Sequence, residues 1–163
     1  MSTTTANGEA TIEAVENMPA ITITREFAAT PAQLVKAHTD PELFVQWVGP
    51  GGSKMVIDHW DARTGGSWRY VDHTDGEEYA FHGSFHDVRD DRLVQTFTFE
   101  GFPDAVALEE MTFEELGDGR TRLHLQSLFN SYEARDGMLS SGMDIGVNAG
   151  YAKLDGLIAD GAL

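Results

Sequence analysis

The longest helical pattern in the chain lies near its C-terminus, in residues 140–158. Apolar and small side chains recur there at steps of three and four residues, which places them on one face of an α-helix. These positions are Met143, Val147, Gly150, Tyr151, Leu154, Leu157 and Ile158. Such a face needs a partner to cover it. Because the middle of the chain is rich in strand patterns, we expect the helix to pack on a sheet, with any functional site where the two meet.

The first strand of that sheet is predicted at residues 21–27, where apolar and polar residues alternate with a period of two. Two short helices are predicted to follow. Each begins with an N-cap residue and a proline at the first helical position, at Thr30-Pro31 and again at Asp40-Pro41. The second helix is expected to end at the glycine-rich residues 49–52.

After Lys54 the period returns to two, and turn residues interrupt the pattern at regular intervals. Links as short as Gly65-Gly66 and Asp75-Gly76 favour antiparallel hairpins over parallel crossovers. Six further strands are therefore predicted, at residues 55–61, 67–73, 79–88, 93–100, 106–116 and 121–129.

The first 18 residues are polar and carry only isolated apolar positions, so we expect residues 1–18 to form a flexible acidic tail and residues 19–163 a single domain. The chain has no run of about 18 apolar residues and no basic start followed by an apolar centre, so neither a membrane span nor a signal peptide is predicted. A cytoplasmic protein is expected. The absence of cysteine excludes disulfides, thiolate metal ligands and a cysteine nucleophile.

The formal net charge is −16, from 27 acidic and 11 basic residues. Such a charge repels nucleic-acid phosphates and anionic membranes, so neither is expected as a partner. The acidity is interpreted as a device for solubility or for life at high salt.

A series of short motifs runs in a fixed order through residues 21–158. They are Arg25-Glu26-Phe27, Thr39-Asp40-Pro41-Glu42, Trp47-Val48-Gly49-Pro50, Asp61-Ala62-Arg63-Thr64-Gly65-Gly66-Ser67-Trp68-Arg69, Gly83 with Phe85, Arg92-Leu93-Val94 with Thr96, Gly119-Arg120-Thr121-Arg122-Leu123, and Ser141-Gly142-Met143 with Gly146. Together with the order of the elements, these motifs resemble the family named after the activator of the heat-shock protein 90 ATPase. That family lies within the START-like, or SRPBCC, superfamily, which is also called birch-pollen-allergen-like.

This resemblance implies an α+β helix-grip fold, in which a curved antiparallel sheet of about seven strands wraps a long C-terminal helix and two short helices follow the first strand. It also implies a ligand cavity between sheet and helix. One departure concerns Val147, because such proteins commonly carry a tryptophan at that position. The smaller side chain either enlarges the cavity or leaves space that a neighbour such as Trp60 fills.

Strand alternation indicates which side chains face this cavity, since Trp68 and Tyr70 share one strand face and Phe97 and Phe99 another. The alternative is an ordinary filled core. Four glycines of the C-terminal helix each cost roughly 0.8–1 kcal/mol relative to alanine, so either the sheet approaches closely there or space is kept for a ligand. The predicted ligand-binding residues are Trp47, Trp60, Trp68, Tyr70, Phe97, Phe99, Met111, Phe113, Met143, Val147 and Tyr151.

Catalytic motifs are scarce: the sequence has no nucleophile elbow, no dinucleotide fingerprint and no phosphate-binding loop. His82 and His86 lie on a predicted strand, roughly 13 Å apart, which is too far to share a metal ion. No metal or cofactor is expected. Asp58 and Tyr70 are the candidates for a general acid or base.

Three functions are compatible with these patterns. The preferred hypothesis is the binding of a small apolar or aromatic ligand, and the second is an enzyme of cyclase or dehydratase type that uses Asp58 or Tyr70. The third is a chaperone-associated interaction module. The eukaryotic activator carries an additional N-terminal domain, however, and residues 1–18 are too few to supply one, so activation of the chaperone is not expected. A homodimer through an edge strand is compatible with the sequence, which does not require it.

Overall fold

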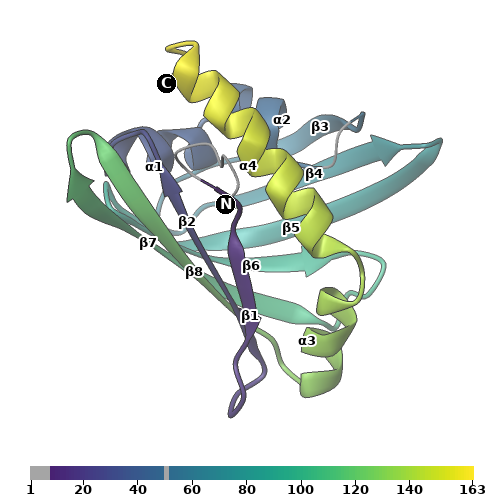
Figure 1. The fold of residues 1–163 in the computed structure, drawn as a ribbon. Helices are drawn as coiled ribbons and strands as arrows, with labels where there is room; N and C mark the ends of the chain where they lie inside the picture. Colours follow the sequence, from purple (N-terminus) through teal and green to yellow (C-terminus); the bar gives the residue numbers. More distant parts are fainter. Residues whose placement is uncertain (1–7, 50–51) are drawn as a thin grey trace.

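The computed structural model describes residues 8–49 and 52–163 (Figure 1). Within them, eight strands form one antiparallel sheet. The strands are β1 Thr11–Ala14, β2 Ala20–Phe27, β3 Lys54–Trp60, β4 Ser67–Thr74, β5 Glu77–Val88, β6 Arg92–Phe99, β7 Val106–Gly117 and β8 Arg120–Leu128. Their order across the sheet is β1-β2-β8-β7-β6-β5-β4-β3, so β1 and β3 form its two edges.

The helices are α1 Pro31–Thr39, α2 Pro41–Trp47, α3 Tyr132–Leu139 and α4 Met143–Ala159. Helix α1 begins with a capping box, in which the Thr30 hydroxyl accepts from the Gln33 N–H and the Gln33 side chain accepts from the Thr30 N–H. Asp40 is the N-cap of α2, and its carboxylate accepts a hydrogen bond from the N–H of Glu42 at 2.9 Å. Gly142 precedes α4 with a φ of 85°, a conformation that glycine adopts without strain and that separates α4 from α3.

Helix α4 crosses the concave face of the sheet, with α2 packed against it and α3 at its N-terminal end (Figure 1). The predicted α+β helix-grip fold is confirmed, including the two short helices and the long C-terminal helix. The sheet has one strand more than predicted. The extra strand, β1, lies in the segment that the sequence assigned to the tail, and it pairs with β2 from Thr11↔Thr24 to Ala14↔Ile21.

The core lies between α4 and the sheet and continues under α1. Phe27 of β2, Leu34 of α1, Leu123 of β8 and Leu154 of α4 are all fully buried there. None of the helices in the described part of the chain is long and apolar enough to cross a membrane.

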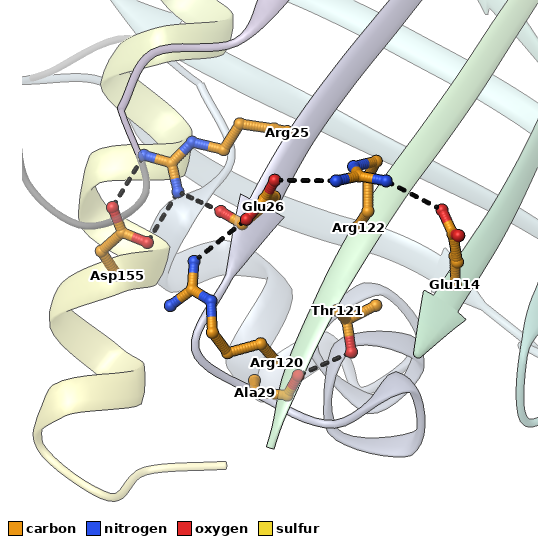
Figure 2. Close-up of polar contacts among 8 residues, drawn as sticks. All are labelled: Arg25, Glu26, Ala29, Glu114, Arg120, Thr121, Arg122 and Asp155. Atoms are coloured by element: carbon orange, nitrogen blue, oxygen red, sulfur yellow. Dashed lines mark hydrogen bonds and ion pairs between the residues drawn. The ribbon is translucent and has the colours of Figure 1, made fainter. Parts of the chain in front are cut away.

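A partly buried ion pair fixes α4 to the sheet (Figure 2). The guanidinium of Arg25 on β2 donates to both carboxylate oxygens of Asp155 on α4, each at 2.7 Å. It also lies over the rings of Phe27 and Tyr151, 4.7 and 5.7 Å from their centroids. Paired hydrogen bonds and aromatic contact together offset the cost of burying this charge.

On the opposite face of β2, the Glu26 carboxylate forms ion pairs with two arginines of the neighbouring strand β8. The guanidinium groups of Arg122 and Arg120 lie 3.1 and 3.4 Å from its oxygens (Figure 2). Arg122 reaches Glu114 on β7 as well, at 3.4 Å. The motif Arg25-Glu26-Phe27 therefore has a structural role. Arg25 binds α4 on one face of the sheet, and Glu26 binds β8 on the other.

Candidate functional site

A cavity of about 320 Å³ lies between α4 and the inner face of the sheet. This volume falls within the range of roughly 300–1,000 Å³ that is typical of small-molecule sites. Nine of the eleven predicted ligand-binding residues line it: Trp47, Trp60, Trp68, Tyr70, Phe97, Met111, Met143, Val147 and Tyr151. They come from α2, α4 and four strands, so the site depends on the whole fold.

The other two predicted residues do not line the cavity. Phe113 is buried beneath it, where its ring centroid lies 5.6 Å from that of His38. Phe99 lies at the end of β6, where it packs against Phe81 and Phe102 with ring centroids 5.2 and 5.9 Å away. Both residues share a strand face with cavity residues, but alternation fixes the face alone and not the distance along the strand.

The tryptophans of α2 and β3 are held by carbonyl groups of α1. Trp47 donates its indole N–H to Ala37 at 3.0 Å, and Trp60 donates to Thr39 at 2.7 Å. These bonds satisfy the polar end of each indole, so the rings can present apolar faces to the cavity. The ring of Phe44 lies between them and Tyr70, 4.8 Å from Trp60 and 5.6 Å from Tyr70.

The glycines of α4 have two different surroundings: one lies against a neighbouring helix, and another faces open space in the cavity. At Gly150 a Cβ atom would lie 2.9 Å from the Trp47 carbonyl oxygen, so the glycine permits close approach of α2. At Gly146, which lines the cavity, a Cβ atom would meet nothing within 4 Å. Val147 and Trp60 both line this same cavity.

A row of polar residues crosses the floor of the cavity on three adjacent strands. Gln95 of β6 is the direct partner of Glu109 on β7, which in turn is the partner of Ser127 on β8. The Gln95 amide donates to the Glu109 carboxylate at 2.9 Å. Burial raises the pKa of Glu109, and the Gln95 hydrogen bond offsets part of that increase.

His38 contributes a further polar group, from α1. Its Nδ1–H donates to the Leu34 carbonyl at 2.7 Å, and its ring lies between those of Trp47 and Phe113. Burial lowers the pKa of His38 to about 4. The imidazole is therefore neutral at physiological pH, with Nε2 as a hydrogen-bond acceptor.

Asp58 is not in the cavity, so it is removed as the acid or base of a cavity reaction. Its side chain is 59% exposed and lies 3.5 Å from Arg69 on the outer face. The cause is an irregularity in the pairing of β3 with β4 between Ile57 and His59. This bulge interrupts the alternation, so Trp60 faces inward while Asp58 and His59 are both exposed.

Tyr70, the second catalytic candidate, does line the cavity. Its pKa is raised, first by burial and then by the charges of Glu109 and Asp72. At neutral pH its hydroxyl is therefore protonated and serves as a hydrogen-bond donor, not as a base.

Glu109, Gln95 and His38 were missed by the sequence reasoning. A signal for Glu109 was present, because it alternates with Ala107, Met111 and Phe113 on a strand whose other face is exposed. Within residues 8–49 and 52–163, no group of three or more His, Cys, Asp or Glu side chains is placed to hold a metal ion.

Taken together, a curved antiparallel sheet that encloses an aromatic cavity against its last helix defines a helix-grip protein of the SRPBCC type. The chain belongs to the family described as Activator of Hsp90 ATPase homolog 1-like protein, whose model matches residues 28–159.

Solved structures with this fold include Ms6760 from Mycobacterium smegmatis, which is 27% identical over 91% of this chain and 96% of its own, with a TM-score of 0.80. A protein from Rhodobacter sphaeroides is 26% identical over 92% of this chain and 98% of its own, with a TM-score of 0.82. DynU16, a protein of the dynemicin biosynthetic locus, shares the fold at 20% identity and a TM-score of 0.63, over 88% of this chain and 48% of its own. The search of curated protein sequences found no match.

Proposed function

We propose that this protein binds a small apolar or aromatic molecule in the cavity between α4 and the sheet. The observation that carries the proposal is the 320 Å³ space itself, which aromatic side chains and Met111, Met143 and Val147 surround. A filled core at this position would bring the side chains into mutual contact at the density of an organic crystal. Membership of a family with a ligand-binding fold supports the same function.

The first test is native mass spectrometry of freshly purified protein, followed by thermal shift with 2-naphthylmethanol as a probe of suitable size. A co-purifying mass, or a rise in melting temperature that grows with probe concentration, is the expected result. If the protein carries no mass and no probe of one or two rings raises its melting temperature, the proposal fails.

A substitution in α4 tests where the ligand lies. The variant Val147→Trp should fold with little loss of stability, because the indole enters space beside Gly146, and it should abolish probe binding. A site that is packed solid would instead lose about 1–3 kcal/mol of folding free energy through overpacking. Ile145→Trp is the matched control, since Ile145 is 71% exposed on the same helix, and it should bind the probe as the unchanged protein does.

The expectations for cellular location, nucleic-acid binding, membrane binding and self-association stay predictions. We expect a cytoplasmic protein without nucleic-acid or membrane partners, because its charge of −16 opposes both. A homodimer, if it forms, would use β1 or β3, the two edges of the sheet.

A further inference from the structure

Glu109 is an acid without a basic partner among the residues that the structure describes. It is half-buried and lines the cavity, and no Lys, Arg or His side chain in the described ranges forms an ion pair with it. Among the other carboxylates of the described residues, Asp155 is bound by Arg25, Glu100 by Arg69 and an acid of β5 by Arg92 at 2.7 Å, whereas the buried Asp72 of β4 likewise forms no ion pair. Enclosing a carboxylate without a counter-charge is costly, so the site gains most from a partner that supplies positive charge.

The cavity wall does not supply that charge. No lysine or arginine is among the described residues that line it, and His38 is neutral above a pKa of about 4. The Gln95 amide already donates to Glu109. The indole N–H of Trp68 has no partner in the described part of the chain, but the atom is covered by its neighbours and does not reach the cavity. The Tyr70 hydroxyl is a neutral donor in the wall, while the Glu109 carboxylate and the neutral His38 imidazole are acceptors that favour a ligand that donates hydrogen bonds.

Aromatic rings surround the same region. Tyr70 and Tyr151 line the same cavity as Glu109, and the charge of Glu109 contributes to the raised pKa values of both tyrosines. Trp68 stacks on Tyr70 with centroids 5.4 Å apart, and Trp47 stacks on Tyr151 at 6.0 Å. Aromatic faces attract organic cations, most strongly where water is excluded.

The charge of the whole chain acts in the same direction. With a net charge of −16, the protein raises the local concentration of cations and lowers that of anions. A carboxylated or phosphorylated aromatic molecule would be repelled by the net charge of the protein and, inside the cavity, by the Glu109 carboxylate. Among the described residues, the cavity lining has no basic side chain to bind it.

We propose that the ligand of this cavity is an aromatic or apolar molecule that carries a protonated amine, with the ammonium group bound to the Glu109 carboxylate and the apolar part held among the aromatic rings. Gln95 orients the carboxylate from the neighbouring strand. This inference rests on the proposed function, since it names the chemical class of the ligand for the same cavity.

Three probes with one carbon skeleton test the proposal by isothermal titration calorimetry at pH 7 and low salt: 2-naphthylmethylammonium, 2-naphthylmethanol and 2-naphthoate. The ammonium probe should bind most tightly, the alcohol about tenfold to a hundredfold more weakly, and the carboxylate weakest, because one charge-assisted hydrogen bond distinguishes the first two. Equal binding of amine and alcohol would overturn the inference while leaving the proposed function intact. No binding by any of the three would overturn both.

The variant Glu109→Gln keeps the shape and removes the charge. It should lose the preference for the amine over the alcohol and bind 2-naphthylmethanol as before. Glu115→Gln is the matched control, because Glu115 lies on the same strand, is exposed outside the cavity and changes the net charge equally. If the control lowers the preference as much as Glu109→Gln does, the general field and not Glu109 selects the amine, and the assignment to Glu109 is wrong. Should Glu109→Gln fold poorly, the three-probe comparison on the unchanged protein still decides the ligand class.

Discussion

His38 shows how a single residue links the wall of the cavity to the stability of the fold. It is 7% exposed, donates to the Leu34 carbonyl and lies against Trp47 and Phe113. Burial disfavours its charged form, so the folded protein holds it neutral at pH values where an exposed histidine is already protonated.

This arrangement predicts a loss of stability in acid. The pKa of His38 falls from 6.5 to about 4 on folding, so between these two values the unfolded chain binds a proton that the folded chain does not. Stability should therefore decrease as the pH falls through this window, by about 3 kcal/mol in total.

Urea unfolding between pH 7 and pH 4 measures the effect. The unchanged protein should lose more stability over this range than His38→Asn, in which the amide can replace the Nδ1 donor but does not titrate. His86→Asn, at an exposed position, should behave as the unchanged protein does. Identical pH dependence in His38→Asn and the unchanged protein would show that His38 is not held neutral.

At the scale of the element, α4 is both a wall of the cavity and a packed helix. Its two inward glycines meet different surroundings, since Gly150 faces the Trp47 carbonyl and Gly146 faces the cavity. The sequence predicts that these glycines allow either close packing or open space, but not which glycine does which. The distance from α4 to α2 depends on contacts between segments about 100 residues apart.

This difference predicts opposite effects of the same substitution. Gly146→Ala should stabilise the protein by up to about 1 kcal/mol, because alanine favours the helix and its methyl group meets no neighbour. Gly150→Ala should destabilise it by about 1–3 kcal/mol, because the methyl group would lie 2.9 Å from a backbone oxygen that can yield only if a helix moves. Urea unfolding of both variants at pH 7 measures the two changes, and equal effects would contradict this view of the helix.

At the scale of the whole molecule, hydrophobic periodicity was sufficient for the order of elements and the side of the sheet that α4 covers. It failed where a pattern was short or interrupted. The four residues of β1 are too few to show alternation, and their place in the sheet depends on pairing with β2 and on the bond from the Ala10 N–H to Asn148 of α4. The bulge beside Asp58 places that side chain on the outer face while Trp60 lies inward as predicted, because it inserts a residue that alternation does not predict.

The candidate site was predictable in its apolar part and not in its polar part. Alternation predicts which aromatic residues share a strand face, and it placed Trp68 and Tyr70 correctly at the cavity. Glu109 alternates with the buried residues Ala107, Met111 and Phe113, which indicates its strand face, but only the register places it beside Gln95 and Ser127. The polar contacts of such a residue depend on its neighbours on other strands, and the sequence of one strand does not predict which residues these are.

The methionine methyl groups provide the most direct test of a ligand cavity, through 13C-methyl NMR spectra during titration with 2-naphthylmethylammonium. Met111, Met138 and Met143 line the cavity, whereas Met18 and Met55 do not. The account predicts ring-current shifts and ligand contacts at the first three signals, unchanged signals for Met18 and Met55, and the loss of all shifts in Val147→Trp. Shifts confined to Met18 or Met55, or a spectrum that the probe leaves unchanged, would contradict it.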